Sequence, residues 1–98
     1  MKIYIAGAIT GNPNYKEDFA KAEQFLLGMG LTVVNPVKNE GFSYKDYIDM
    51  GLNELMRCEA IYMLKNWKKS KGADFELQYA LLTGLKVFFE DGNYKDFA

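Results

Sequence analysis

Histidine is absent from this 98-residue chain, and cysteine and tryptophan each occur once. The absence of histidine excludes Ser-His-Asp and Cys-His catalysis and histidine-ligated zinc sites. The single cysteine, Cys58, cannot form a disulfide within the chain or a four-thiolate metal site, which favours a reducing, cytoplasmic location. Any catalysis must therefore use carboxylates, tyrosine, lysine, hydroxyl groups and backbone amides, and we expect neither a metal nor a cofactor.

The chain also lacks an excess of charge of one sign and a long apolar run. The 12 basic and 13 acidic residues leave a formal net charge of −1, which argues against a nucleic-acid partner. No apolar stretch reaches the ~18 residues of a membrane span, and the first residues lack the apolar segment of a signal peptide. We expect a small-molecule partner, and neither nucleic acid nor membrane.

The composition that is present favours a folded core, because 49% of the residues are hydrophobic and 15% are aromatic. Length and composition predict one domain over residues 1–98, with a tail at 91–98. Fifteen aromatic residues exceed what a unit of this size can readily bury, and the surplus is expected at Tyr44, Tyr47, Phe75, Tyr79, Tyr94 and Phe97. An exposed patch of this kind predicts a homodimer or a higher even homo-oligomer.

Hydrophobic periodicity predicts four strands that alternate with three helices. Short apolar runs rich in β-branched and aromatic residues predict strands at 2–6, 31–34, 60–64 and 85–89. Apolar side chains at helical spacing follow each of the first three strands. Asn14 is a plausible N-cap of the first helix, Ser43 with Asp46 approximates a capping box for the second, and Gly84 ends the third.

The alternation of strands and helices predicts a parallel sheet with right-handed crossovers and helices on both faces, a three-layer α/β/α fold. The flavodoxin-like strand order 2-1-3-4 is the natural choice for four strands. Ligands of such folds bind beyond the carboxyl ends of the strands, where the winding direction reverses. The loops Gly7–Asn14 and Lys65–Gly72 are therefore expected to flank the binding crevice.

The first of these loops contains Gly7-Ala8-Ile9-Thr10-Gly11 between a strand and a helix. Two glycines allow the backbone to approach a ligand closely, and a helix N-terminus favours an anion such as phosphate. The spacing matches neither the dinucleotide-binding fingerprint nor the P-loop. A turn that only connects the strand to the helix explains the pattern equally well.

The second loop combines four lysines, Trp67, Ser70 and, at the helix start, Asp74 and Glu76. Glu76 is either a catalytic carboxylate or a charge that stabilises the helix N-terminus. Trp67 either stacks on a nucleobase, closes the loop over the core, or contacts a second copy. The lysines either attract an anion or are solvated. The convergence of Glu76, Ser70 and the first loop on one crevice favours a functional site.

Three segments together resemble the nucleoside 2-deoxyribosyltransferase superfamily, which includes the 2-deoxynucleoside 5′-monophosphate N-hydrolases. They are Ile3-Tyr-Ile-Ala-Gly7, Ser70-x-Gly-x-x-x-Glu76, and Tyr79-Ala80 with Gly84. The stretch from Met63 to Glu76 is closer still to a small branch of that superfamily known as a domain of unknown function. The likeness spans residues 2–89.

The resemblance implies a role for each matching residue. Glu76 corresponds to a nucleophilic glutamate that displaces the base and forms a glycosyl-enzyme ester. Tyr4 corresponds to a tyrosine that orients this carboxylate, although a half-buried strand aromatic is its simpler reading. Ser70 and the first-loop amides correspond to a 5′-phosphate site. The predicted substrate-binding residues are Gly7, Ala8, Ile9, Thr10, Gly11, Trp67, Ser70 and Gly72.

The chain departs from the resembled enzymes on the second helix. Their aspartate, which contacts the sugar and assists the leaving base, falls on Gly51. Asp49 is the predicted catalytic substitute, with Asn53 as a second one, and Asp74 either replaces the acid or caps the third helix.

The predicted function is an N-glycosidic bond hydrolase or transferase that acts on a nucleoside or a (deoxy)nucleoside 5′-monophosphate through a covalent glycosyl-glutamate. One alternative is a nucleotide-binding module without turnover, which serves as a sensor or sequesters a nucleotide. The other is a small interaction protein that has no affinity for nucleotides.

Overall fold

The computed structural model describes residues 1–38 and 43–92, where strands and helices alternate as predicted. The strands are β1 (Lys2–Ala6), β2 (Thr32–Val34), β3 (Ala60–Met63) and β4 (Lys86–Phe89). The helices are α1 (Tyr15–Gly28), α2 (Tyr44–Leu55) and α3 (Lys71–Thr83), with short 3-10 helices η1 (Pro36–Lys38) and η2 (Trp67–Lys69). All three strand pairs are parallel and the order is β2-β1-β3-β4, which confirms the predicted sheet.

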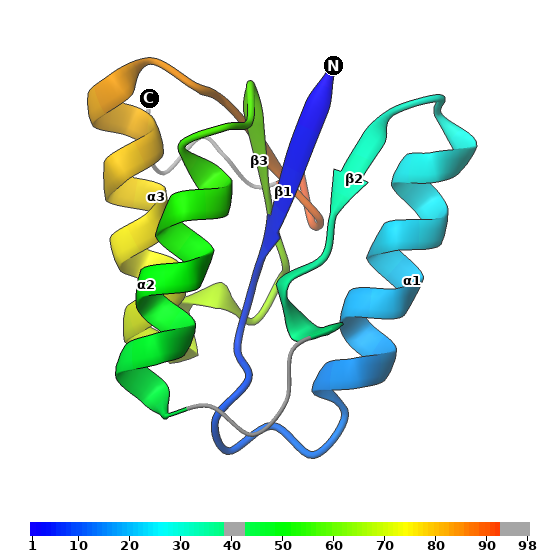
Figure 1. Ribbon diagram of the computed structural model, residues 1–98. Coiled ribbons are helices and arrows are strands. Elements are labelled where there is room, and N and C mark those ends of the chain that lie inside the picture. The colour runs from blue at the N-terminus through cyan, green and yellow to red at the C-terminus, as the bar shows by residue number, and fades with distance from the viewer. Residues whose placement is uncertain (39–42, 93–98) are drawn as a thin grey trace.

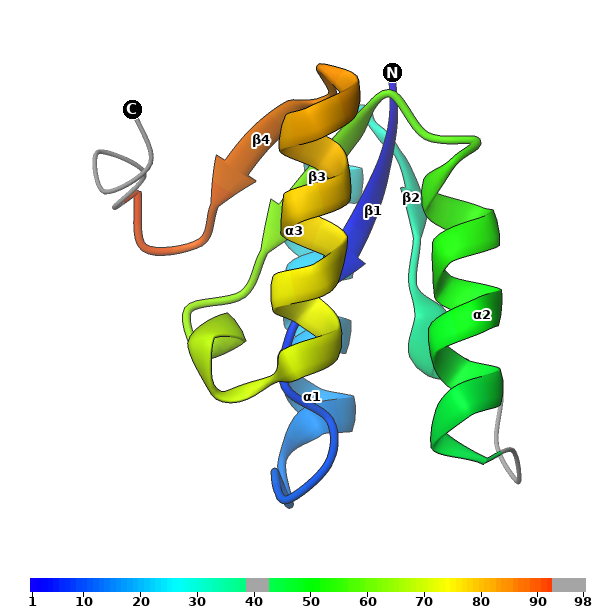
Figure 2. The same ribbon diagram turned by 90° about the vertical axis from the view of Figure 1, so that its left-hand side faces the viewer.

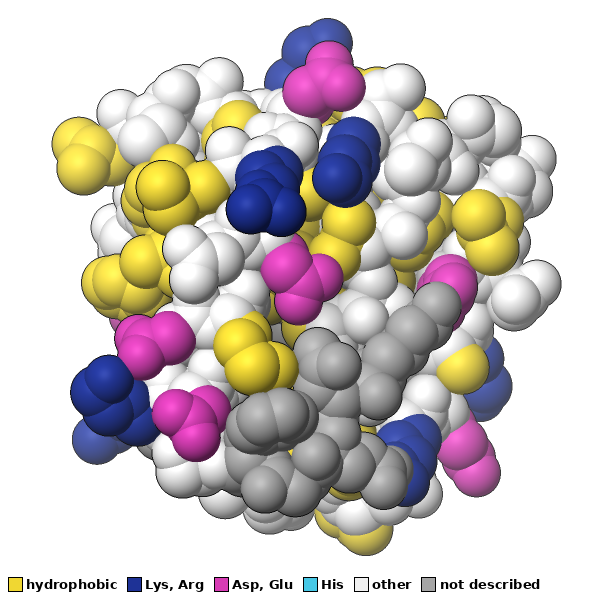
Figure 3. Space-filling view, in the orientation of Figure 1, with side chains coloured by type: hydrophobic (Ala, Val, Ile, Leu, Met, Phe, Trp, Pro, Cys, Tyr) yellow, Lys and Arg dark blue, Asp and Glu magenta, His cyan; other side chains and the backbone are white. Residues whose placement is uncertain are grey.

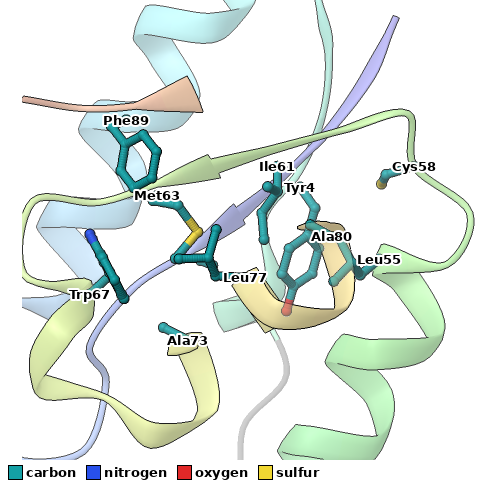
Figure 4. Close-up of a cluster of buried hydrophobic side chains, with 11 residues drawn as sticks. Tyr4, Leu55, Cys58, Ile61, Met63, Trp67, Ala73, Leu77, Ala80 and Phe89 are labelled. Carbon is teal, nitrogen blue, oxygen red and sulfur yellow. The ribbon is translucent and has the colours of Figure 1, made fainter. Parts of the chain in front are cut away.

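Helices cover both faces of this sheet, α1 on one face and α2 with α3 on the other (Figures 1 and 2). Because side chains alternate across a strand, β1 supplies both layers of the core. Ile3 and Ile5 pack with α1 residues such as Phe19, whereas Tyr4 and Ala6 pack with residues of α2 and α3. The second of these clusters is drawn in Figure 4. The three-layer α/β/α arrangement is therefore confirmed.

Local sequence signals fix the ends of the helices on the α2–α3 face. The Ser43 side chain accepts a hydrogen bond from the Asp46 amide, and the Asp46 carboxylate accepts one from the Ser43 amide. This pair of bonds confirms the capping box. The Ser70 hydroxyl caps α3 by accepting from the Ala73 amide at 3.1 Å. Asp74 therefore lies in the first turn of α3 and is not its cap. Gly84 ends α3 with a φ of 77°, a left-handed conformation that glycine adopts without strain.

Charged side chains of both signs are interspersed on the face shown in Figure 3, and the lysines and arginines do not gather in one patch. Among the helices in the described part of the chain, none combines the length and apolar character needed to cross a membrane.

Candidate active site

A cavity of about 500 Å³ lies over β1 between α2 and the start of α3, a volume within the usual range of small-molecule sites. Residues from β1, the loop after it, α2 and the first turns of α3 line it. The two predicted loops both contribute, so the crevice forms at the expected switch point between β1 and β3. Helix α2 forms one side of the cavity, a contribution that the strand order alone did not predict.

Tyr4 and Glu76 meet inside this cavity. The Tyr4 hydroxyl donates a hydrogen bond of 2.6 Å to Glu76 Oε2. The two residues are only 2% and 9% exposed. Because α3 begins at Lys71, Glu76 lies in its second turn. The helix dipole stabilises negative charges in the first turn, so it does not account for Glu76. Glu76 is thus not a solvated charge that stabilises the helix N-terminus.

The electrostatics of this pair follow from its burial. Removal from water disfavours the charged carboxylate and raises the pKa of Glu76 to about 7, with the Tyr4 hydrogen bond opposing this shift and the nearby Glu54 adding to it. Burial is also the main reason that the pKa of Tyr4 lies well above its ordinary value, followed by the charge of Glu76. Near neutral pH Glu76 therefore exchanges between acid and carboxylate, while Tyr4 remains a hydrogen-bond donor.

Gly51 brings α2 against the hydroxyl–carboxylate pair. A Cβ atom at this position would lie 2.5 Å from the Tyr4 hydroxyl oxygen and 2.7 Å from Glu76 Oε2. Any side chain there would have to displace one of the two groups. Glycine at this position therefore allows α2 to approach the pair more closely than a residue with a side chain could.

The first loop is held in place by an asparagine that the sequence analysis did not single out. The Ala8 amide donates to Asn66 Oδ1 at 3.2 Å, and Asn66 Nδ2 donates to Asp18 at 3.4 Å. Asn12 Nδ2 donates to the same Asp18 oxygen at 3.1 Å and to the Ala8 carbonyl at 3.0 Å. These bonds link the two loops that flank the cavity. The signal in the sequence that could have pointed to Asn66 was its place in the second loop, one residue before Trp67.

Of the five first-loop residues predicted to bind substrate, Gly7, Ile9 and Thr10 line the cavity, whereas Ala8 and Gly11 do not. The Ala8 amide is engaged by Asn66, and Gly11 is exposed with a φ of 77° that serves the turn. Gly7 has a packing role as well, because a Cβ there would lie 2.6 Å from a Leu64 side-chain carbon.

Around the start of α3, the predicted substrate-binding residues Ser70 and Gly72 line the cavity, together with Lys69 and Lys71. The Ser70 oxygen is used as the helix cap, and its own hydroxyl proton remains a donor for a ligand. The two lysines bring positive charge to the same end of the cavity.

Three further candidate residues lie away from the cavity. Trp67 is 6% exposed and packs in the core, with its ring centroid 6.1 Å from that of Phe89 (Figure 4). It closes the loop over the core and offers no stacking surface to the cavity. Asp49 is exposed on α2 and forms an ion pair of 2.8 Å with Lys45, so it does not reach the cavity. Asn53 is also exposed outside the cavity lining.

Glu54 is an ionisable cavity residue that the sequence analysis missed. It follows Gly51 by one helical turn and lines the cavity from α2. Burial is the largest influence on its carboxyl group and raises its pKa, although Lys2 and Arg57 act in the opposite direction. In the described part of the chain, no group of three or more Cys, Asp or Glu side chains is arranged to hold a metal ion.

Comparisons with known proteins agree with this architecture. Among solved structures, a 2-deoxyribosyltransferase from Bacillus psychrosaccharolyticus has a TM-score of 0.70 at 23% identity, over 91% of this chain and 71% of its own. A 2-desoxiribosyltransferase from Leishmania mexicana has a TM-score of 0.69 at 22% identity, over 90% of this chain and 62% of its own. At these identities the likeness shows a shared fold, and it confirms the structural resemblance predicted from the sequence.

No curated protein matches the chain. The model of one family, described as Domain of unknown function (DUF4406), matches residues 1–89. Because this match covers nearly the whole sequence, the chain belongs to the DUF4406 family.

Proposed function

We propose that the protein is an N-glycosidic bond hydrolase or transferase that acts on a nucleoside or a (deoxy)nucleoside 5′-monophosphate through a covalent glycosyl-glutamate. The main support is the buried 2.6 Å hydrogen bond from Tyr4 to Glu76 inside a ligand-sized cavity. A buried carboxyl group held by a neutral hydroxyl costs stability, and strongly shifted groups of this kind cluster at functional sites. Two proteins with this fold are described as 2-deoxyribosyltransferases, which supports the same reaction class.

In this mechanism the ionised Glu76 attacks the anomeric carbon of the sugar. The carbon–nitrogen bond breaks, its electron pair goes to the base, and an ester forms between the sugar and Glu76. Water or a second base then attacks the same carbon, and the carboxylate of Glu76 is released. Tyr4 keeps the carboxylate in one orientation through its hydrogen bond.

The residues at the start of α3 are suited to bind a 5′-monophosphate, the part of the substrate farthest from the base. Ser70 and Gly72 lie there with Lys69 and Lys71, and Thr10 approaches from the first loop. A hydroxyl donor, two ammonium groups and the positive end of a helix together attract an anion. A monophosphate should therefore be a better substrate than the bare nucleoside.

The test is release of free base from a panel of nucleosides and their 5′-monophosphates, measured by chromatography for the wild type and Glu76→Gln. Wild type should release base, and the amide should reduce the rate at least about 1,000-fold because it keeps the shape and loses the nucleophile. Asp74→Asn is the matched control, since this carboxylate is exposed on α3 outside the cavity. Base release that survives in Glu76→Gln rules out the covalent mechanism.

A non-catalytic nucleotide-binding module is the second candidate, and Gly51 is the observation that favours it. The carboxylate of the resembled enzymes is missing there, and the tight contact with Tyr4 and Glu76 leaves no room for it. Calorimetry separates the two functions: a binding module takes up nucleotide and releases no base, whereas an enzyme does both. Absence of binding would favour the interaction protein.

A further inference from the structure

Two carboxyl groups line the cavity among the described residues, Glu76 from α3 and Glu54 from α2. The proposed reaction assigns a role to Glu76 only. The departing base also needs a proton, because an anionic base nitrogen is a poor leaving group, and the aspartate expected to assist it is absent at Gly51. Asp49 is turned away from the cavity and paired with Lys45.

Glu54 lies on the face of α2 that points at the reacting groups. Residues three apart on a helix share a face, so Glu54 lies on the same face as Gly51, where an added Cβ would overlap both the Tyr4 hydroxyl and Glu76. The side chain is half-buried, and its charge acts on both Tyr4 and Glu76. A ligand that fills the cavity would cover it further.

We propose that Glu54 is the acid that protonates the leaving base, in place of the carboxylate missing at position 51. This inference rests on the proposed function. As Glu76 bonds to the anomeric carbon, the carbon–nitrogen bond breaks and the Glu54 proton goes to the base nitrogen. In the second step Glu54, now ionised, takes a proton from the attacking water, the sugar–Glu76 ester breaks, and both groups return to their starting states.

The surroundings favour this division of roles between two carboxyl groups. Burial raises the pKa of both carboxyl groups, and the charge of Glu54 adds to the shift of Glu76, so both groups bind a proton more tightly than they would in water. The Tyr4 hydroxyl donates to Glu76 and so stabilises its ionised form, the form that attacks the sugar, while Glu54 supplies the proton for the base. The positive charges of Lys2 and Arg57 lower the pKa of Glu54. The Cys58 thiol also lies near Glu54 and carries no positive charge.

The experiment compares Glu54→Gln with wild type on two substrates. One is the best nucleotide of the panel, whose base must be protonated to leave. The other is a 4-nitrophenyl 2-deoxyriboside 5-phosphate, whose nitrophenolate leaves without a proton. Glu54→Gln should lose at least about 100-fold in base release from the nucleotide and less than about threefold with the nitrophenyl compound. Glu17→Gln, an exposed carboxylate on α1 outside the cavity, is the control, and thermal melting verifies that each variant is folded.

The outcomes separate this inference from the function on which it rests. A wild type that cleaves neither compound refutes the proposed function. A Glu54→Gln variant that matches wild type on the nucleotide refutes the role of Glu54 and leaves the function of Glu76 intact. Equal losses on both compounds also overturn the proposal, because they assign Glu54 to binding or structure and not to proton donation.

Discussion

At the scale of single residues, Gly51 shows how the absence of a side chain determines the geometry of the site. The Tyr4 hydroxyl and Glu76 Oε2 both occupy the space that a Cβ at position 51 would need. Glycine within α2 destabilises the helix by about 1 kcal/mol relative to alanine. The helix thus gives up local stability at the point where it contacts the hydroxyl–carboxylate pair.

Gly51→Ala should therefore separate stability from activity. The gain of about 1 kcal/mol in helix propensity offsets the displacement of Tyr4 or Glu76, so the free energy of unfolding should change by no more than about 1 kcal/mol. Base release should fall at least about 10-fold because the carboxylate leaves its position. Denaturant titration and the base-release assay measure the two quantities.

The matched control is Gly28→Ala at the end of α1, where a Cβ would meet nothing within 4 Å. This variant should keep full activity. An active Gly51→Ala would show that the pair does not depend on the close approach of α2.

Glu76 should make the protein less stable as the pH rises. Its pKa is about 7 in the folded protein and 4.5 as the ordinary value, so the folded state binds the proton more tightly than the unfolded state. The contribution to stability is complete below pH 4.5, is lost progressively as the pH rises to about 7, and is absent above that value. The loss amounts to about 3 kcal/mol.

Denaturant titrations of wild type and Glu76→Gln at pH 5 and pH 8 measure this effect. Other groups titrate alike in both proteins, so the difference in unfolding free energy between wild type and variant isolates Glu76. The unfolding free energy of the variant relative to that of the wild type should be higher at pH 8 than at pH 5. Parallel pH dependences in the two proteins would contradict the raised pKa.

At the scale of secondary structure elements, the features that the sequence predicted correctly are those that depend on local signals. The strand runs, the Ser43 capping box and the left-handed Gly84 all depend on neighbouring residues, and the structure agrees with them. The contact between Tyr4 and Glu76 was implied by the resemblance to the 2-deoxyribosyltransferase superfamily, and the strand order is consistent with it because β1 lies beside the strand that precedes α3.

The errors concern the direction in which a helix or loop presents its side chains. Asp49 was preferred as the substitute for an acid at Gly51, yet two positions correspond to a rotation of about 200° around a helix. It therefore faces solvent, while Glu54, three positions beyond Gly51, lines the cavity. The sequence left three placements open for Trp67, and the turn of η2 orients its side chain into the core.

At the scale of the whole molecule, the surplus of apolar side chains predicts self-association. Phe75 is exposed as expected, Tyr47 and Tyr79 are half-buried, and the Tyr44 side chain and residues Tyr94 and Phe97 lie outside the described part of the chain. A second apolar groove, of about 660 Å³, runs between α1 and β4. Exposed side chains at its margins include Phe25, Met29 and Phe88.

We propose that copies of this chain associate as an even homo-oligomer, and this groove is the described surface best suited to the contact. Light scattering at micromolar concentration should give about twice the chain mass of 11.2 kDa or a higher even multiple. Met29→Glu combined with Phe88→Glu should lower the mass to that of the monomer. A monomeric wild type would contradict the association, and an oligomeric double variant would assign it to another surface.

The burial of Trp67 also gives the molecule an internal fluorophore. It is the chain's one indole, and it lies in the core beside Phe89 rather than in the cavity. Its emission should be at short wavelength in the folded protein and move to long wavelength on unfolding, because the indole then enters water. A nucleotide in the cavity should leave the spectrum of the folded protein nearly unchanged. Fluorescence of the unlabelled protein thus measures the folded fraction of every variant independently of whether it binds ligand.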